Sequence, residues 1–337
     1  MKLIIQIPCL NEEQVLPQTL ADLPREVEGF DAVEWLVIDD GSTDRTADVA
    51  HEHGVDHIVR FTSNKGLAVA FQAGIDAALK LGADVIVNTD ADNQYRGSDI
   101  PKLVAPILGH QADLVVGDRN VREHEEFSRM KRLLQSWGSW VVRQASETDV
   151  PDATSGFRAY NREAALRLNV VSRFTYTLET LIQAGKSDVA VTHVPIGTNT
   201  KTRESRLFRS IPEYLTRSVG TILRIYVAYE PLRVFLRLAA LVSLGGFVLL
   251  GRWLYLWATE PGATGHIQSL IVGVGLLIFA LQLAMLGVIG ELLRANRVVS
   301  ERTLERVRKI ELALGVLPDS LPGEERPAVR EREPVES

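Results

Sequence analysis

The stretch Val85-Ile86-Val87-Asn88-Thr89-Asp90-Ala91-Asp92-Asn93-Gln94 decides how the N-terminal part of this chain folds. Its first four residues form a short apolar run, which is typical of a strand buried on both faces of a parallel sheet. Two carboxylates, Asp90 and Asp92, follow that run. An Asp-X-Asp pair alone more often marks a solvated turn, but at a strand end it can bind a hard cation together with substrate phosphates. The stretch therefore predicts a Mg²⁺ or Mn²⁺ site at one edge of a sheet.

Short apolar runs alternate with longer amphipathic segments on both sides of this stretch, up to about Val194. This alternation is typical of strands and crossover helices in a mostly parallel sheet, so we predict a doubly wound α/β fold. The predicted strands are Leu3–Ile7, Trp35–Ile38, His57–Phe61, Val85–Asn88, Leu114–Val116 and a strand near Val189–Val194. The predicted helices are Glu12–Leu23, Thr43–His53, Gly66–Leu81, Pro101–Gly109 and Arg129–Ala145.

Polar residues also follow the first two predicted strands. Ligands of doubly wound sheets bind outside the carboxyl ends of the strands, which makes Asn11, Glu12 and Asp40 candidates for contact with a nucleoside. Glu12 could equally be an acid in the first turn of a helix, and this alternative stays open. For Asp40 we favour ligand binding, whereas Ser42 and Thr43 are predicted to cap the following helix.

Two long apolar segments, Leu232–Trp257 and Ile267–Leu293, exceed the roughly 20 residues that a helix needs to cross a bilayer. The flanks before the first segment and after the second are rich in Arg, whereas the connection Ala258–His266 has neither Lys nor Arg. The positive-inside rule then predicts an integral membrane protein whose N-terminal domain and both termini are cytoplasmic. The alternative, two buried helices of a soluble domain, fits these lengths and charges poorly.

The overall charge gives no sign of nucleic-acid binding, because 43 acidic residues outnumber 37 basic ones and the net charge is -6. The charge is unevenly distributed along the chain: the segment 201–237, which leads into the first apolar segment, has eight basic residues and three acidic ones. Such a segment can attract anionic lipid head groups. The single cysteine, Cys9, excludes an internal disulfide.

Five short motifs, in this order, resemble those of the family 2 glycosyltransferases of GT-A fold. The resemblance covers about Lys2 to Val194, and with the two apolar segments the chain is most similar to the dolichol-phosphate mannosyltransferase and polyprenyl-phosphate glycosyltransferase branch. The motifs are Pro8…Asn11-Glu12-Glu13, Asp39-Asp40-Gly41-Ser42-Thr43-Asp44, Asn64-Lys65-Gly66, Asp90-Ala91-Asp92 and Gly117-Asp118-Arg119.

The resemblance also implies which residues form the site. Asp90, Asp92 and Gln94 would hold the metal ion and the diphosphate, with Arg119 on the donor phosphate. For Lys65 a surface position at the start of a helix is an equal alternative. The residues implied in nucleotide-sugar binding are Pro8, Asn11, Glu12, Ile38, Asp40, Lys65, Asp90, Ala91 and Arg119.

The segment Asp152-Ala153-Thr154-Ser155-Gly156-Phe157-Arg158 resembles the acceptor-side loop of the family. Asp152 would act there as a general base, or would position the acceptor or stabilise the loop if the acceptor is a phosphate that needs no deprotonation. Arg203 and Arg206 would pair with an acceptor phosphate, or would attract lipid head groups in general. The implied catalytic residues are Asp92, Asp152 and Arg119.

The expected reaction is an inverting transfer of a hexose from a GDP- or UDP-linked donor to a polyprenyl or dolichyl phosphate at the cytoplasmic membrane face. Alternatives are transfer to a lipid hydroxyl or a polysaccharide chain, and a membrane scaffold without catalysis. Leu10 and Tyr95-Arg96-Gly97 depart from the pattern of the mannosyltransferases, so the sugar and the base stay open. The sequence also leaves open whether the chain forms a homo-oligomer.

The predicted organisation has six parts. They are a GT-A catalytic domain (1–200), a basic juxtamembrane amphipathic segment (201–230), transmembrane helices (232–257 and 267–293), a cytoplasmic helix (294–316) and a disordered tail (317–337).

Overall fold

The computed structural model describes residues 1–120, 143, 146, 148–170, 176–187, 189–199, 226–227, 229–259 and 267–318. The chain divides into two compact units, one of residues 1–207 and 307–337 and one of residues 208–306. The predicted helix Arg129–Ala145 lies outside the described residues except for Arg143. Most of the predicted juxtamembrane segment and the tail from residue 319 lie outside them too.

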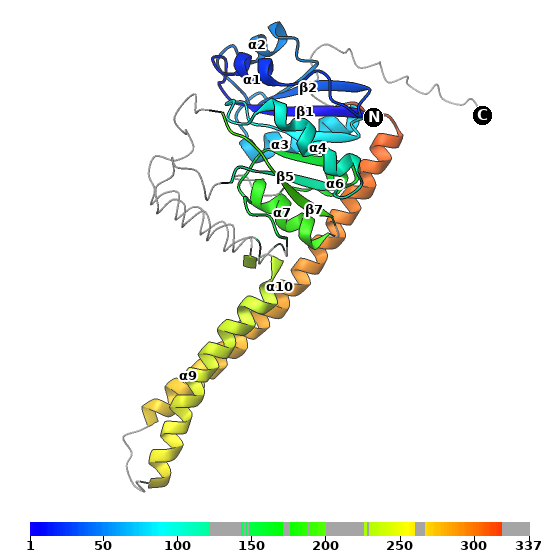
Figure 1. The fold of residues 1–337 in the computed structure, drawn as a ribbon. Coiled ribbons are helices and arrows are strands. Elements are labelled where there is room, and N and C mark those ends of the chain that lie inside the picture. The colour runs from blue at the N-terminus through cyan, green and yellow to red at the C-terminus, as the bar shows by residue number, and fades with distance from the viewer. Residues whose placement is uncertain are drawn as a thin grey trace, which may run out of the picture. The chain divides into compact units, whose positions relative to one another are not determined.

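A seven-stranded sheet forms the core of the first unit (Figure 1). Its strands are β1 (Lys2–Cys9), β2 (Ala32–Asp39), β3 (His57–Arg60), β4 (Val85–Asn88), β5 (Leu114–Asp118), β6 (Arg158–Asn161) and β7 (Val191–Pro195). They lie in the order β3-β2-β1-β4-β6-β5-β7. All pairs are parallel except those of β6, which runs antiparallel between β4 and β5. The predicted mostly parallel α/β sheet is therefore confirmed.

Strand β6 was not predicted, and its composition explains why. Its four residues, Arg-Ala-Tyr-Asn, contain no apolar run. Arg158 is nevertheless fully buried, because its guanidinium donates to Ser155 O, Ala153 O and Thr180 Oγ1 at 2.8–2.9 Å. A buried arginine is tolerated only when its donors are paired in this way. All three partners lie outside the strand, so the sequence of the strand does not predict the burial.

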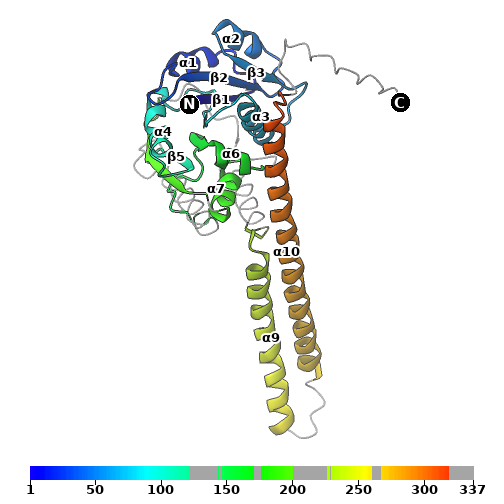
Figure 2. The same cartoon turned by 90° about the vertical axis from the view of Figure 1, so that its right-hand side faces the viewer.

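Helices cover both faces of the sheet (Figures 1 and 2). In the first unit they are α1 (Leu16–Asp22), α2 (Thr46–Glu52), α3 (Leu67–Lys80), α4 (Ile100–Leu108), α6 (Arg162–Arg167) and α7 (Thr177–Lys186), with a 3₁₀ turn at Gly97–Asp99. Alternate residues of β1 point to opposite faces. Leu3, Ile5 and Ile7 share one apolar cluster with residues of α1, α2 and α4, whereas Gln6 faces α3 at Gly74.

The helix starts differ from the predicted ones. Helix α1 begins at Leu16 rather than Glu12, and α2 begins at Thr46 with Arg45 before it, so the prediction that Ser42 and Thr43 cap this helix is wrong. Both residues instead hydrogen-bond to Asn11, in the loop after β1. A short polar side chain can hydrogen-bond to a backbone group of a neighbouring loop instead of one at a helix start. Here Ser42 and Thr43 bond to the loop after β1.

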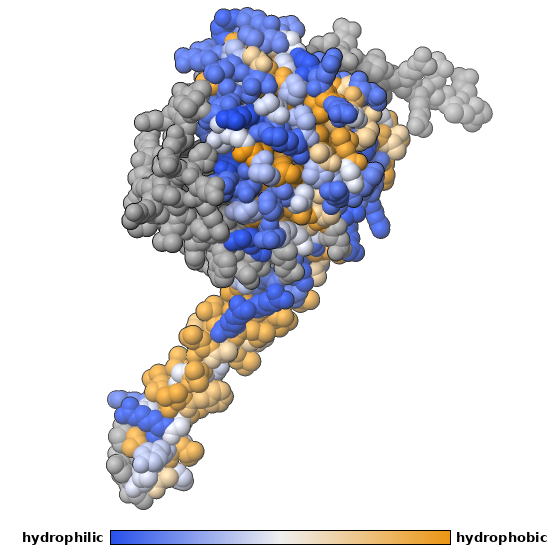
Figure 3. All heavy atoms as spheres, in the orientation of Figure 1, coloured by the Kyte–Doolittle hydropathy of each residue, from blue (hydrophilic) through white to orange (hydrophobic). Residues whose placement is uncertain are grey.

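The second unit contains two long apolar helices, α9 (Pro231–Thr259) and α10 (Ile267–Ala313), the latter ending in the first unit from Val307. In the most apolar 18-residue stretch of each helix, only 11% (α9) and 17% (α10) of the residues are buried. Leu241, Leu244 and Phe247 are more than 60% exposed. The apolar surface is plain in Figure 3. Core helices of a soluble protein would be mostly buried, so the exposure of these side chains supports membrane association.

Within this unit the two helices approach closely at a pair of glycines. A Cβ on Gly246 would lie 3.0 Å from the carbonyl oxygen of Gly273, and one on Gly273 would lie 3.1 Å from that of Gly246. Small residues allow such backbone contact between helices in a bilayer, where the hydrophobic effect does not drive them together.

Candidate active site

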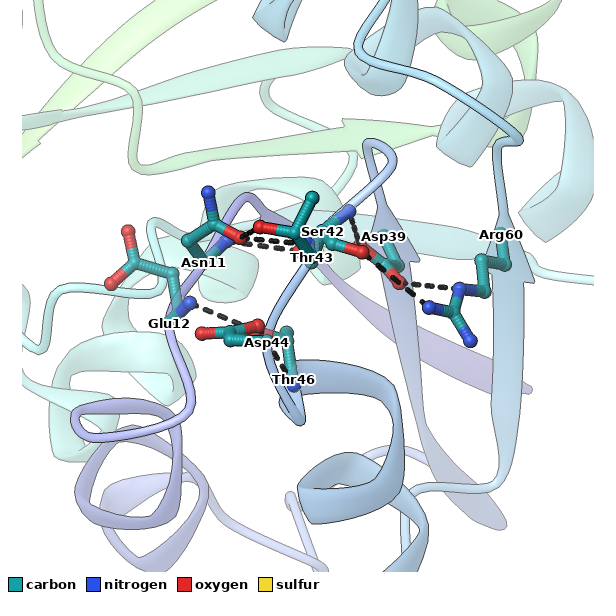
Figure 4. Close-up of polar contacts among 8 residues, drawn as sticks. All are labelled: Asn11, Glu12, Asp39, Ser42, Thr43, Asp44, Thr46 and Arg60. Atoms are coloured by element: carbon teal, nitrogen blue, oxygen red, sulfur yellow. Dashed lines mark hydrogen bonds and ion pairs between the residues drawn. The ribbon is translucent and has the colours of Figure 1, made fainter.

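The loops that follow β1 and β2 meet at the carboxyl edge of the sheet and are tied together by hydrogen bonds (Figure 4). Asn11 adopts a left-handed backbone conformation, with φ at 53°, which asparagine tolerates better than most residues. Its N–H donates to Ser42 Oγ at 2.9 Å, and its Oδ1 accepts from the N–H of Thr43 at 2.9 Å. The N–H of Glu12 donates to Thr46 Oγ1 at 2.8 Å. Asn11 and Glu12, two of the predicted nucleoside ligands, are therefore held in place by the neighbouring loop.

The acidic pair at the end of β2 is buried and already engaged within the protein. Asp39 accepts from the N–H of Ser42 and pairs with Arg60 Nε at 3.0 Å, as Figure 4 shows. The two oxygens of Asp40 accept from the N–H groups of Lys65 and Gly66 at 2.7 and 2.9 Å. Asp40 thus anchors the loop before α3, and each carboxylate oxygen keeps a further lone pair for a ligand.

Three other predicted nucleotide ligands take different positions in this region. Pro8 and Ile38 are buried neighbours on paired strands. Lys65 is exposed, with its ammonium 4.4 Å from the ring centre of Phe61. Both alternatives for Lys65, a phosphate contact and a surface lysine, agree with this position.

The predicted metal ligands lie in the loop after β4. Asp92 Oδ2 accepts from Gln94 Nε2 at 2.7 Å, and the carbonyl of Ala91 accepts from Thr19 Oγ1 at 2.8 Å. Burial and then the charge of Asp92 raise the pKa of Asp90 to about 7, against the opposing charges of Arg119 and Arg158. Two carboxylates that repel each other in a poorly solvated loop suit a divalent cation, which would relieve the repulsion.

The described residues hold no group of three or more His, Cys, Asp or Glu side chains that could bind a metal ion. Among the described residues, amide oxygens such as that of Gln94 are available beside the two carboxylates, and water or substrate phosphates could supply further ligands. Mg²⁺ is commonly bound in this manner, by one or two carboxylates plus phosphate oxygens. The residues present thus fit a metal ion that is shared with a substrate.

Arg119 and Asp152 form a bidentate ion pair. Arg119 Nε and Nη2 donate to the two oxygens of Asp152 at 2.7 and 3.0 Å, and Nη2 also reaches Thr154 Oγ1 at 3.0 Å. Burial opposes ionisation of Asp152, but the charge and hydrogen bonds of Arg119 outweigh burial and lower its pKa. Asp152 is therefore an ionised, paired carboxylate that is 2% exposed.

A second layer of residues, which we did not predict, supports this site. Asn88, Tyr95 and Tyr176 surround Gly156 with hydrogen bonds of 2.8–3.0 Å to its peptide groups and to one another. Tyr95 directly follows Gln94, so its place beside the metal loop could have been found from the sequence. Tyr176 carries no such signal, since 88 residues separate it from Asn88. The predicted acceptor ligands Arg203 and Arg206 lie outside the described residues.

Comparison with known proteins agrees with this geometry. Residues 4–168 match the family described as glycosyl transferase family 2. The undecaprenyl-phosphate mannosyltransferase of Micrococcus luteus is 30% identical over 206 residues, which span 58% of this chain and 83% of the relative. The UDP-N-acetylglucosamine–dolichyl-phosphate N-acetylglucosaminyltransferase of Methanococcus voltae is 28% identical over 214 residues, 57% of this chain and 83% of the relative.

Among solved structures, the glucosyl-3-phosphoglycerate synthase of Mycobacterium tuberculosis, in complex with Mn²⁺, UDP-glucose and phosphoglyceric acid, superposes with a TM-score of 0.54. It is 22% identical and covers 67% of this chain and 79% of its own. This similarity confirms the predicted GT-A type of fold. Given the family match, the relative at 30% identity and the shared fold, the chain belongs to the family 2 glycosyltransferases.

Proposed function

We propose that this chain transfers a sugar from a nucleotide-sugar donor to a polyprenyl phosphate at a membrane surface. The observation that carries the proposal is the carboxylate pair Asp90 and Asp92 at the carboxyl edge of the sheet, in a chain that also has two exposed apolar helices. The names of the two relatives, one acting on undecaprenyl phosphate and one on dolichyl phosphate, support the same acceptor class.

In this proposal Asp90, Asp92 and Gln94 hold a Mg²⁺ or Mn²⁺ ion. The bound cation would act as a Lewis acid that stabilises negative charge on the departing nucleoside diphosphate. The hydrogen bond from Gln94 to Asp92 supports the assignment, because it orients both side chains before any ligand arrives.

The donor would lie along the carboxyl edge of β1, β2 and β4. Asn11, Glu12 and Asp40 would contact the nucleoside from loops already fixed by hydrogen bonds, with Lys65 and Arg119 toward the phosphates. A site ordered in advance loses less entropy when the donor binds. The remaining donor contacts in the proposal are Pro8, Ile38 and Ala91.

The reaction itself would be an inverting displacement, in which an acceptor phosphate oxygen attacks the anomeric carbon as the nucleoside diphosphate leaves. Asp152 is poorly suited to act as a base, because Arg119 occupies both its oxygens and lowers its pKa. A lipid phosphate is already an anion and needs no base. We therefore assign Asp152 a positioning role on Arg119, and we assign Arg203 and Arg206 to the acceptor phosphate.

Two rival functions fit the site less well. Transfer to a lipid hydroxyl would require a general base, and the ion pair of Asp152 argues against that role. A scaffold without catalysis would have no use for two neighbouring carboxylates, one of which, Asp90, has its pKa raised to about 7 by burial and then by the charge of Asp92.

The test is transfer from radiolabelled UDP- and GDP-sugars to polyprenyl phosphate in membranes that contain the wild type, Asp92→Asn or Asp149→Asn. Asp149 is the matched control, since its side chain is 98% exposed three residues from Asp152. We expect labelled lipid with the wild type and the control, and a loss of at least about 100-fold with a chelator or Asp92→Asn. No transfer from any donor by folded wild-type protein would reject the proposal, and transfer that survives both the chelator and Asp92→Asn would reject the metal assignment.

A further inference from the structure

Gly156 lies directly against the carboxylate of Asp90. A Cβ at this glycine would come within 3.1 Å of both carboxylate oxygens and within 2.7 Å of the hydroxyl of Tyr176. The backbone of the loop that carries both Asp152 and Gly156 thus packs against the side chain of Asp90, the candidate metal ligand. Only glycine lets that backbone approach so closely.

Two buried side chains hydrogen-bond to the backbone of Gly156, and a third is hydrogen-bonded to one of them. The N–H of Gly156 donates to Tyr95 Oη at 3.0 Å, and its carbonyl accepts from Asn88 Nδ2 at 2.8 Å. Asn88 Nδ2 also donates to Tyr176 Oη at 2.9 Å. Each of the three is at most 6% exposed.

Packing leaves these side chains little freedom. The ring of Tyr176 stacks on Phe71 with centroids 4.0 Å apart, and that of Tyr95 stacks on Phe157 at 5.1 Å. A tyrosine side chain has only two rotatable χ angles, so it can place its hydroxyl at a small cost in conformational entropy. The arrangement is thus set before any ligand binds.

The network extends to Gln6, which has one unsatisfied atom. Gln6 Nε2 donates to Asn88 Oδ1 at 2.8 Å, which fixes the orientation of the Asn88 amide. Within the described part of the chain, Gln6 Oε1 is buried without a hydrogen-bond partner. A buried acceptor of this kind is destabilising, so stability alone does not explain the arrangement.

We propose that Asn88, Tyr95 and Tyr176 are positioning residues that hold the Gly156 peptide against Asp90 and thereby fix this metal ligand relative to the Arg119–Asp152 pair. The inference rests on the proposed function, because it takes Asp90 as a metal ligand. Residues behind a metal ligand commonly change metal affinity or activity by about 10- to 100-fold when they are replaced.

The experiment measures Mn²⁺ binding directly, by electron paramagnetic resonance of free Mn²⁺, beside kcat and the KM for the donor. It uses the full-length chain in detergent. Tyr176→Phe keeps the stacked ring and removes only the hydroxyl, and Tyr95→Phe does the same at the other end of the peptide. We expect each to weaken Mn²⁺ binding by about tenfold and to lower kcat, because Asp90 loses its fixed position.

Gly156→Ala tests the close approach itself. The added methyl group would collide with the Tyr176 hydroxyl, so we expect a loss of about 100-fold in kcat/KM together with weaker Mn²⁺ binding. The double variant Gly156→Ala with Tyr176→Phe removes that hydroxyl and should bind Mn²⁺ more tightly than Gly156→Ala alone. Such coupling is expected for groups in direct contact and not for distant, independent sites.

Tyr160→Phe is the matched control, since Tyr160 is a fully buried tyrosine whose ring lies 6.0 Å from the same Phe71. It should retain wild-type Mn²⁺ affinity. If the wild type binds Mn²⁺ and Tyr176→Phe and Tyr95→Phe match its affinity and kcat, the inference is overturned while the proposed function stands. If the wild type binds no Mn²⁺, the metal assignment and the inference fall together.

Discussion

At the scale of single residues, the ion pair between Arg119 and Asp152 argues against a role of Asp152 as a general base. A base must be free to accept a proton near the working pH, and a carboxylate held by two N–H groups of a guanidinium is not. The same pair should also make a measurable contribution to stability that depends on pH.

Asp152→Asn should lower the free energy of unfolding at pH 7 by about 3 kcal/mol, because it leaves Arg119 without its counter-charge. The pKa of Asp152 is lower in the folded protein than in the unfolded chain. Its contribution is therefore fully present above the unfolded pKa, about 3.9, and is lost as the pH falls through the folded value. The gap between wild type and variant should narrow below about pH 4 in thermal unfolding of the detergent-solubilised chain.

Asp149→Asn serves again as the control, since the Asp149 side chain is exposed and its 3.8 Å pair with Arg143 should contribute less than about 1 kcal/mol. A gap for Asp152→Asn that stays constant from pH 7 to pH 3 would contradict the assigned pKa direction.

At the scale of elements, the end of α10 belongs to the first unit, and a buried arginine there contacts two other helices of that unit. Arg308 is 8% exposed, and its Nη1 donates to the carbonyls of Leu166 and Leu168 at the end of α6. Its Nη2 pairs with Asp76 of α3 at 2.7 Å. The last carbonyls of a helix have no partner inside that helix, so Arg308 satisfies two acceptors that α6 cannot satisfy itself.

Arg308→Gln should lower the free energy of unfolding of the first unit by about 2–3 kcal/mol, because Asp76 and these carbonyls lose a charged donor. Hydrogen exchange of peptides that cover residues 162–170 should rise with it. Arg306→Gln, an exposed position in the same helix, should stay within about 0.5 kcal/mol of the wild type. Equal effects of the two variants would show that Arg308 contributes only surface charge.

At the scale of the whole molecule, the two apolar helices predict how the chain lies in a membrane. The connection between them has no basic residue, whereas the flanks are rich in arginine. We propose that both helices span the bilayer with the catalytic unit and both termini on the cytoplasmic side.

A membrane-impermeant maleimide tests this orientation in intact cells. Thr264→Cys, in the connection, should be labelled from outside, and Ser320→Cys, in the tail, only after the membrane is opened. The native Cys9 is buried and hydrogen-bonded to Ile7 O, so its background should be low. If the tail but not the connection is labelled in intact cells, the proposed orientation is wrong and the opposite one holds.

The sequence by itself determined the features that depend on local composition. Short, nearly continuous runs of Val, Ile and Leu located β1 to β5, and the two long runs located α9 and the first part of α10, because burial in a sheet core or a bilayer requires such runs. It also placed Asp90 and Asp92 at a strand end, since carboxylates that directly follow a buried strand must lie at its edge.

The tertiary structure alone decided which partner each polar group takes. Ser42 bonds Asn11 rather than a helix end, Arg158 is buried in a strand that has no apolar run, and Tyr176 reaches Asn88 across 88 residues. The physical reason is common to all three. A hydrogen bond gains stability only relative to the competing partners, and those partners come from parts of the chain that folding brings together.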